Sequence, residues 1–425
     1  MHTDGYLARY DALRQTDPGA ALMLLAGWLR TDWRDLFAEL RARRPVLTTP
    51  AFTLVTRHAD VTEVLSRPDS FTVGAYTASM EAALGGPVML TRDATPMNWR
   101  EKGLMRVMLA PEDVPELRAL TGALADEALD SAIDGPGGPG GPDGAIDVVG
   151  SLFRAVPLAV CARYFGFPGP DPRTLSRWSR AVMTDVTANF AGDPAVRAAS
   201  AEAGAEMMAY LRGLVAARRA GPEGGDVLGR LVRTRLPEEL GFDDERIAVN
   251  TAGLLLGFVE NAAGSMTNVL AHFLADPSLM ARAAEAAVDP EHFEPYVWEA
   301  LRFDPFLKMI ARVSVREHVL ASGAVVPSGG LVLAAVASAM FDETAVEEPE
   351  SFRLDRPGHV LLHFGHGPHA CLGVHPGRAV ITEVLRRLLL RPGLRSDGET
   401  VRDRGVFPDS HVLHLDVPTC EESRI

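Results

Sequence analysis

The chain has 425 residues, 47% of them apolar, and it is long enough to bury one large core or several ordinary ones. Its formal net charge of −14 argues against a general nucleic-acid binder, because affinity for phosphates depends on clustered Lys and Arg. Its three cysteines, Cys161, Cys371 and Cys420, are odd in number and far apart, which excludes a disulfide framework and indicates a reducing cytoplasm. The most apolar early stretch, 21–29, is too short to cross a bilayer, so no membrane association is expected.

Helical periodicity dominates the chain. Apolar residues recur three and four positions apart, with charges between them, over 32–44, 115–133, 171–190, 193–219, 243–276 and 378–391. Strand patterns are short and bounded by Gly or Pro, at 46–57, 319–327 and 329–338. The Gly- and Pro-rich run 135–144 is predicted to be a surface loop, because similar amphipathic helices continue on both sides. We therefore expect one mainly α-helical domain, 1–425, with a small β portion.

The stretch HFGHGPHACLG, 363–373, places a lone cysteine in a glycine-rich turn directly before a helical pattern. At the start of a helix, unpaired backbone N–H groups and the helix dipole stabilise an anion, which favours a Cys371 thiolate. Zinc does not suit this site, because no second cysteine lies at the usual short ligand spacing. A buried, inert cysteine is one interpretation. A single axial thiolate to haem iron fits the surrounding residues better.

The loop resembles the haem-ligand loop of the cytochrome P450 family, the haem-thiolate monooxygenases, in the pattern Phe364-Gly365-x-Gly367-x-His369-x-Cys371-x-Gly373. A second family mark lies upstream in Glu299-x-x-Arg302, whose spacing of three places both side chains on one helix face. The resemblance implies the cytochrome P450 fold, mainly α, with haem between a long central helix and the cysteine-loop helix. It also implies that Cys371 is the axial ligand of haem b iron, that Phe364 belongs to the haem-binding loop, and that Glu299 and Arg302 are structural.

Two further residues match family contacts to the haem propionates. Arg312, after a Pro305 turn, matches the family arginine that reaches one propionate, and His369 matches the other contact. Two propionates in a mostly apolar slot are buried anions, which need cationic or N–H partners. The family generally carries Arg at the position of Ser351, where it completes a network with the Glu-x-x-Arg pair. The neighbouring Arg353 is a candidate replacement.

The sequence departs from the family at Asn98 and Lys102, near the start of a predicted helix that ends before residue 109. The family usually has His and Arg four apart there, both aimed at propionates, and these positions are Asn98 and Lys102 here. Lys102 can neutralise a propionate as a point charge but lacks the bidentate fork of arginine. Trp99 and Arg100 are alternative contacts. In the other interpretation all four residues only cap and solvate a helix.

The most informative departure lies in the long apolar helix predicted at 243–276, which the resemblance places across the distal haem face. Oxygen-activating members usually have an acidic residue followed by threonine there, because O–O cleavage needs protons delivered to the distal oxygen. Here the run 260–266 reads ENAAGSM, and no acid is followed by Thr. One alignment places Asn261 and Ala262 at the acid and alcohol positions. The other places Gly264 and Ser265 there, with Ser265 as the alcohol and Glu260 relaying protons through water.

The resemblance implies a haem-thiolate monooxygenase or oxidative tailoring enzyme that acts on a small, largely apolar or aromatic metabolite. The run around Asn261 is also similar to the Asn-Ala-x-Gly-Gly stretch of allene oxide synthases and hydroperoxide lyases. An amide can hydrogen-bond a peroxide oxygen without donating a full proton. A peroxide-driven or hydroperoxide-rearranging enzyme is therefore an alternative. A non-catalytic haem-binding protein is a third hypothesis.

The electrons for oxygenation are predicted to come from separate proteins, a ferredoxin and a ferredoxin reductase. The chain has no cysteine cluster for an iron–sulfur centre and no dinucleotide glycine fingerprint. The helix predicted after Cys371 carries four arginines, namely Arg378, Arg386, Arg387 and Arg391. This basic face suits an acidic ferredoxin by complementary charge, and a merely solvated helix face is the other interpretation.

Overall fold

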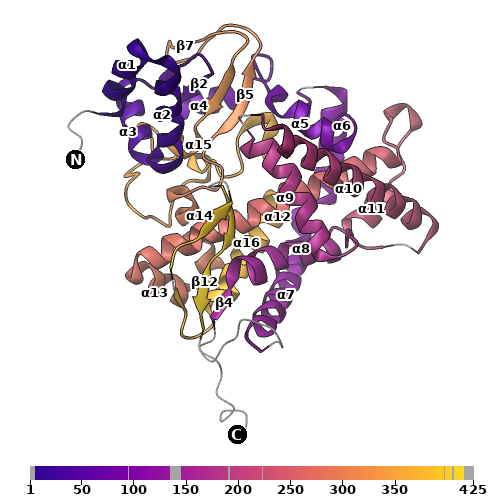
Figure 1. Ribbon diagram of the computed structural model, residues 1–425. Coiled ribbons are helices and arrows are strands. Elements are labelled where there is room, and N and C mark those ends of the chain that lie inside the picture. Colours follow the sequence, from indigo (N-terminus) through magenta and orange to yellow (C-terminus); the bar gives the residue numbers. More distant parts are fainter. Residues whose placement is uncertain are drawn as a thin grey trace. The chain divides into compact units, whose positions relative to one another are not determined.

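The computed structural model describes residues 5–93, 95–134, 145–189, 192–222, 224–396, 398–403 and 406–415 (Figure 1). The loop predicted at 135–144 lies outside the described residues. The chain divides into two compact units. The first comprises Met1–Tyr76, Leu90–Ala94 and Arg302–Cys371, and the second comprises Thr77–Met89, Thr95–Leu301 and Leu372–Ile425. The single domain over 1–425 stays a prediction.

The first unit contains a five-stranded sheet with the strand order β1-β2-β8-β5-β3. Its strands are β1 (Val46–Thr48), β2 (Phe52–Val55), β8 (Leu331–Ala334), β5 (Ile310–Ser314) and β3 (Phe71–Thr72). β2 and β8 are parallel, and the other neighbouring strands are antiparallel. Strands far apart in the sequence are thus neighbours, and Arg312 in β5 lies opposite Val332 in β8.

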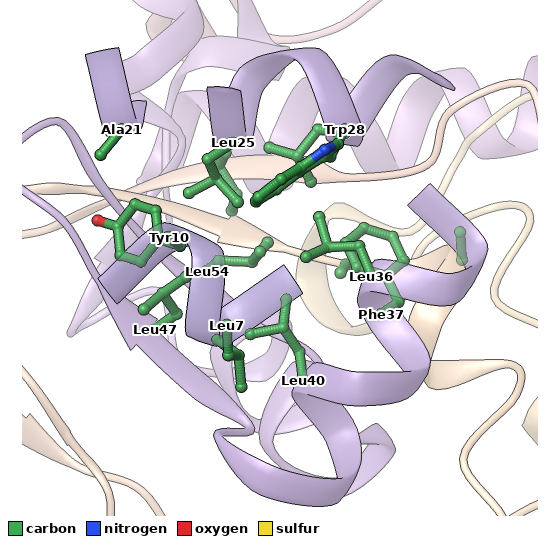
Figure 2. Packing of buried hydrophobic residues seen from close by; sticks show 14 of the residues in the cluster. Leu7, Tyr10, Ala21, Leu25, Trp28, Leu36, Phe37, Leu40, Leu47 and Leu54 are labelled. Atoms are coloured by element: carbon green, nitrogen blue, oxygen red, sulfur yellow. The ribbon is translucent and has the colours of Figure 1, made fainter. Parts of the chain in front are cut away.

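Alternate residues of the central strands face opposite sides of this sheet, as the two-residue period of a strand requires. Leu54 and Leu333 pack with α1 (Tyr6–Thr16), α2 (Pro18–Thr31) and α3 (Trp33–Arg43), in the cluster that Figure 2 shows. Val55 and Val332 pack on the other face with α4 (His58–Ser66) and the hairpin of β6 (His318–Val319) and β7 (Val325–Val326). Each fully buried Leu or Val contributes about 1.5–3 kcal/mol.

The second unit is helical, and α12 (Asp244–Ala275) contacts most of its other helices. Asp243 caps the first turn of α12 by accepting a hydrogen bond from the Arg246 N–H. Among the described helices, α12 alone is long and apolar enough to cross a membrane, but 78% of its apolar window is buried inside the protein. It is therefore a core helix. It packs against α9 (Pro172–Ala188), α10 (Pro194–Ala220) and α16 (Val374–Leu389).

The other helices and strands are shorter or lie around these cores. The α-helices are α5 (Thr77–Leu84), α6 (Pro96–Met108), α7 (Val114–Asp134), α8 (Ala155–Arg163), α11 (Val227–Arg233), α13 (Pro277–Ala286), α14 (Pro290–Phe303) and α15 (Val336–Ala339). The single-turn helices are η1 (Val73–Tyr76), η2 (Met89–Thr91), η3 (Pro111–Asp113), η4 (Val149–Arg154), η5 (Glu238–Leu240), η6 (Gly358–Val360) and η7 (Gly367–His369). The remaining strands are β4 (Ala145–Asp147), β9 (Arg395–Ser396), β10 (Val401–Asp403), β11 (Phe407–Ser410) and β12 (Val412–His414).

The mainly α-helical fold with a small β portion is confirmed, and the six predicted helices correspond to α3, α7, α9, α10, α12 and α16. The stretch 46–57 holds two strands, β1 and β2, joined by a turn. The strand predicted at 329–338 is right only to Ala334. Residues 336–339 form α15 instead, because this Ala-rich segment favours a helix. The strand β5 was not predicted from the sequence, because Arg312 interrupts its apolar pattern.

Two glycines of α10 provide a matched test of its packing. A Cβ at Gly204 would collide with the carbonyl oxygen of Ala83 in α5, whereas a Cβ at Gly213 would meet nothing within 4 Å. We expect Gly204→Ala to lower the free energy of unfolding by about 1–3 kcal/mol through overpacking. Gly213→Ala is expected to raise it by roughly 0.5–1 kcal/mol, because alanine loses less backbone entropy in a helix. Urea unfolding of both variants measures the difference, and equal stabilities would contradict the close α5 to α10 contact.

His411 makes the stability of the fold sensitive to acid. Its Nε2 lies 3.0 Å from Ser396 Oγ and its Nδ1 2.9 Å from Thr400 Oγ1. Burial lowers the pKa of His411 below its usual value, and nearby Arg402 lowers it further against the opposing effect of Asp147. As the pH falls below about 6.5, the unfolded chain takes up a proton that the folded protein does not yet bind. The free energy of unfolding therefore decreases with falling pH.

His411→Gln is expected to flatten this decrease, which urea unfolding at a series of pH values between about 7 and 5 would show. His292→Gln is the control, because the His292 side chain is 80% exposed. The slope should stay at the wild-type value in the control. An unchanged slope in His411→Gln would assign the acid sensitivity to another group, such as His58, whose pKa burial also lowers.

Candidate functional site

The cysteine loop of the first unit folds as a tight glycine turn. The Cys371 N–H donates to the Phe364 carbonyl oxygen at 2.8 Å, and α16 begins at Val374, shortly after the cysteine. Gly365 and Gly367 both have φ of 71°, in the left-handed region that favours glycine. At Gly367 a Cβ would also lie 2.6 Å from the Leu65 carbonyl oxygen. Cys371 is exposed and forms no disulfide within the described residues. The turn therefore places an exposed cysteine near a helix start, and its role as the haem ligand stays a prediction.

Arg312 is a buried cation without a carboxylate partner among the described residues. Its side chain is 3% exposed, and its Nη1 donates to the Ala311 carbonyl oxygen at 2.9 Å. Burial lowers the pKa of Arg312, and the nearby groups Tyr76 and Asp93 oppose this shift. A buried charge is costly unless it is paired. The position therefore suits an anionic group of a ligand.

His369 contacts a carboxylate that the sequence did not single out. Its Nε2 lies 3.0 Å from Asp93 Oδ1, and the Val73 N–H donates to both Asp93 oxygens at 3.2 and 3.0 Å. Asp93 also lies close enough to Arg312 to act on its pKa. Arg312 and His369 are both predicted to contact propionates, and they therefore share one acidic neighbour. No periodicity or motif around residue 93 pointed to this contact.

The α6 residues separate into a buried and an exposed set. Asn98 and Lys102, one turn apart, are 3% and 5% exposed, whereas Trp99 is 63% exposed. The Asn98 amide donates to the Met89 carbonyl oxygen at 2.9 Å, and Thr95 caps the helix by accepting from the Asn98 N–H. Arg100 is half-buried. The predicted pair Asn98 and Lys102 is thus on the buried face of α6, and Trp99 is on its solvent face.

One stripe of α12 is not covered by other described residues of the chain. Gly253, Gly257, Asn261 and Ser265 recur every four residues on one helix face, and a Cβ added at either glycine would meet nothing within 4 Å. Asn261 Nδ2 donates to the Gly257 carbonyl oxygen at 2.9 Å, while Asn261 Oδ1 is buried without a partner. Ser265 is half-buried and Gly264 is buried. Both candidate residues, Asn261 and Ser265, therefore lie on the same uncovered face, and the four-residue spacing of this stripe could have been found in the sequence.

Glu260 points away from this stripe into an ion cluster. Its side chain is fully buried, and its two oxygens accept from Arg154 Nε at 3.2 Å and Arg180 Nε at 3.1 Å. Both arginines also donate to the Pro408 carbonyl oxygen. Glu260 thereby joins α12 to η4, α9 and the β10–β11 hairpin. This arrangement favours a structural role for Glu260, and its predicted proton relay stays a prediction.

The comparisons with known proteins identify the family. Residues 225–401 match the family model described as Cytochrome P450. Nocardicin C N-oxygenase of Nocardia uniformis subsp. tsuyamanensis is 30% identical over 380 residues, which cover 86% of this chain and 89% of that protein. The chain belongs to the cytochrome P450 family. Cyclomarin C epoxidase CymV of Salinispora arenicola is 29% identical, with coverage of 81% and 83%. The structure of cytochrome P450 TbtJ1 matches with a TM-score of 0.73 and 26% identity, covering 94% of this chain and 98% of that one.

As a cytochrome P450, the protein is a haem-thiolate monooxygenase with a small-molecule substrate and a redox partner, and its cofactor is haem with thiolate-ligated iron. The residues present fit this cofactor. Cys371 is an exposed cysteine that suits a thiolate ligand, the buried Arg312 pairs with no carboxylate of the described residues, and the stripe on α12 is not covered by them.

The Glu-x-x-Arg residues of this P450 lie in α14, where Glu299 is 2% exposed and Arg302 is fully buried. Arg302 donates to the carbonyl oxygens of Met340 and Ser351 at 3.1 and 3.2 Å. Arg356 donates to the same Ser351 oxygen at 2.7 Å. Arg353, the predicted replacement, pairs with surface acids, including Asp355 at 3.0 Å, and its part in this network stays a prediction. Arg356 shares the Ser351 carbonyl oxygen with Arg302, and Arg302 holds the loop around Ser351.

The predicted basic face of α16 in this P450 is neutralised within the chain. Each of its four arginines pairs with a carboxylate, in the pairs Arg378 with Glu294, Arg386 with Glu383, Arg387 with Glu383 and Asp126, and Arg391 with Asp126 and Asp130. The acids come from α7 and α14 as well as from α16 itself. The docking surface and the solvated face both stay predictions, although these ion pairs weaken the positive charge that a ferredoxin would meet. The sequence alone could not place Asp126 and Glu294 beside this helix.

Proposed function

We propose that the protein is a cytoplasmic cytochrome P450 that uses haem b and electrons from a ferredoxin and its reductase to oxygenate a small, largely apolar or aromatic secondary metabolite. One oxygen atom of dioxygen enters the substrate, and the other leaves as water with two electrons and two protons. The names of similar proteins support the substrate class, since they include an erythromycin C-12 hydroxylase and a cyclomarin C epoxidase. The observation that carries the proposal is Ser265 on the uncovered stripe of α12, whose hydroxyl makes no hydrogen bond within the described part of the chain and is therefore a candidate proton donor.

The residues of the first unit hold the cofactor in this proposal. Haem with a thiolate-ligated iron supplies the activation of dioxygen when bound. Cys371 provides the thiolate, and the glycine turn at Gly365 and Gly367 lets backbone N–H groups approach its sulfur. Arg312 and His369 neutralise propionates, because each is a largely buried cationic or N–H donor. Asn98 and Lys102 are the corresponding residues proposed for α6.

Proton delivery is assigned to Ser265 and Asn261. The Ser265 hydroxyl makes no hydrogen bond within the described part of the chain, so its O–H can donate to a bound oxygen species or water. Thr251 and Thr267 differ, because their hydroxyls donate to carbonyl oxygens four residues earlier at 2.8 and 2.7 Å. Asn261 Oδ1 is an unpaired acceptor that suits a water molecule. A hydroxyl and an amide thus replace the usual acid and alcohol.

Peroxide-driven or hydroperoxide-rearranging chemistry is the second candidate function. The observation in its favour is that the uncovered stripe carries no acid and that both oxygens of Glu260 are bound by arginines. One N–H of the Asn261 amide is used by Gly257, which leaves the other to contact a peroxide oxygen. A non-catalytic haem-binding protein is the third hypothesis, and turnover with any oxidant separates it from both enzymes.

An anaerobic experiment separates the two enzyme functions. The ferric holoprotein is mixed with a lipid hydroperoxide without reductant, and hydroperoxide loss and products are followed. In parallel, the holoprotein receives dioxygen, ferredoxin, reductase and a panel of apolar metabolites. We expect product formation only in the second mixture. Rapid anaerobic conversion to rearranged or dehydrated products would instead support the role of Asn261 as a peroxide contact.

Ser265→Ala is expected to reduce the fraction of electrons that reach product by about tenfold or more, because positioned proton donors contribute about 10²–10⁴-fold. The measurement is product formed against reductant consumed, with released hydrogen peroxide as the complement. Thr267→Ala is the matched control, since its hydroxyl is buried and donates to Ala263. Equal coupling in Ser265→Ala and the control would remove Ser265 from the proton path.

Cys371→Ser is expected to abolish the thiolate-type absorption of the reduced carbon-monoxide complex, because an alcohol does not supply a thiolate ligand. Cys161→Ala is the control, since Cys161 is buried and burial raises its thiol pKa. The control should retain the wild-type spectrum. A thiolate-type spectrum in Cys371→Ser would exclude Cys371 as the ligand.

A further inference from the structure

The Tyr76 hydroxyl hydrogen-bonds the edge of β5 at a point where β3 no longer pairs with that strand. β3 pairs with β5 only at Thr72 with Val313 and Phe71 with Ser314, and the chain then turns into η1. The next residue of β5 on this edge is Ala311, whose N–H donates to the Tyr76 hydroxyl oxygen at 2.9 Å. The phenol thus takes the place of a strand carbonyl, and it satisfies a backbone donor that would otherwise lack a partner.

The guanidinium of Arg312 contacts the same residue of β5. Arg312 Nη1 donates to the Ala311 carbonyl oxygen, and the Tyr76 hydroxyl accepts from the Ala311 N–H. In an extended strand, the N–H and C=O of one residue point to the same side. The phenol and the guanidinium therefore lie on the same edge of β5, where each hydrogen-bonds the backbone of Ala311.

The Tyr76 phenol stays protonated at neutral pH, so its O–H can donate a hydrogen bond. Burial raises the pKa of Tyr76, more than the Ala311 N–H and the nearby Arg312 charge lower it. The hydroxyl oxygen already accepts one hydrogen bond, so the O–H remains as a donor. The described residues provide no acceptor for this O–H.

The neighbouring carboxylate is already engaged. Asp93 accepts from the Val73 N–H and contacts His369, which fixes the start of η1 while the Ala311 N–H fixes Tyr76 at its end. A neutral O–H donor and a buried guanidinium thus lie together, and among the described residues neither makes a hydrogen bond or an ion pair to a carboxylate. This pair matches the needs of one carboxylate from a ligand.

We propose that Tyr76 donates a hydrogen bond to the haem propionate that Arg312 binds, so that Tyr76 is a further cofactor-binding residue. The inference rests on the proposed role of Arg312. Tyr76 then links two contacts, since its oxygen accepts from the sheet edge and its hydrogen donates to the cofactor. Its rigid placement by η1 and β5 lets the propionate bind to a donor that is already oriented.

Tyr76→Phe in the holoprotein tests this inference with two readouts besides activity. Haem release to excess apomyoglobin is expected to become on the order of tenfold faster, as for the loss of one hydrogen bond to a charged group. The propionate bending band in the resonance Raman spectrum is expected to shift. The reduced carbon-monoxide spectrum should keep its thiolate type, because Cys371 is unchanged.

Tyr164→Phe is the matched control, because it also removes the hydroxyl of a half-buried tyrosine, which here donates to Asp113 at 2.8 Å. Its haem release and propionate band should equal those of the wild type. If Tyr76→Phe only lowers stability and leaves both readouts unchanged, Tyr76 merely caps Ala311 and the inference is wrong. Arg312→Gln distinguishes a failure of the Tyr76 inference from a failure of the proposed role of Arg312. If it too leaves the propionate band unchanged, the assigned role of Arg312 fails with the inference.

A second measurement covers the case in which Tyr76→Phe does not fold. The wild-type protein is reconstituted with haem and with haem dimethyl ester, which lacks the propionate charges. Ultraviolet resonance Raman spectra report the hydrogen bonding of tyrosine. A tyrosine band that differs between the two reconstituted proteins supports the phenol-to-propionate bond, and identical tyrosine bands contradict it.

Discussion

The cost of burying the Arg312 charge is the constraint on which the first unit depends. Removing a guanidinium from water costs several kcal/mol unless an anion compensates it. β5 places this side chain in the sheet, where it is 3% exposed and contacts a backbone carbonyl but no carboxylate of the described residues. The fold thus keeps a local electrostatic deficit, and in our proposal a carboxylate of the cofactor relieves it. If Arg312 has this role, haem binding stabilises the first unit as well as supplying chemistry.

The geometry of α12 places the Glu260 carboxylate and the uncovered stripe on different sides of the helix. Glu260 and Asn261 are adjacent in sequence, so their side chains lie about 100° apart around the axis. Glu260 enters a fully buried cluster with Arg154 and Arg180, while Asn261 lies on the stripe of Gly253 and Gly257. The same helix can therefore hold its neighbours by ion pairs and still offer a neutral surface to ligands. In our proposal, proton transfer on that surface depends on a hydroxyl, an amide and water.

The sequence predicted those features whose residues lie close together in the chain. The glycine turn around Cys371 is a local pattern, and the six helices follow from their own periodicity. The contacts of the site residues could not be predicted in this way, because they join distant segments. Asp93 and His369 are 276 positions apart in the sequence, and Tyr76 and Ala311 are 235 apart, so no local pattern predicts these contacts. β5 was not predicted because Arg312, the residue proposed to bind a propionate, interrupts its apolar pattern.

The ion pairs of α16 bear on how a redox partner recognises this P450. Gly122 in α7 is needed for the cluster, because a Cβ there would lie 2.7 Å from Arg387 Nη2 and 2.8 Å from Glu383 Oε1. Burial of Glu383 opposes its charged form, but Arg386 and Arg387 outweigh this and hold its pKa below the usual value. These arginines thus serve the packing of α16 on α7. A ferredoxin that approached them would meet nearly balanced charges, so long-range attraction there is weak. Recognition must therefore depend on other cations or on apolar contact.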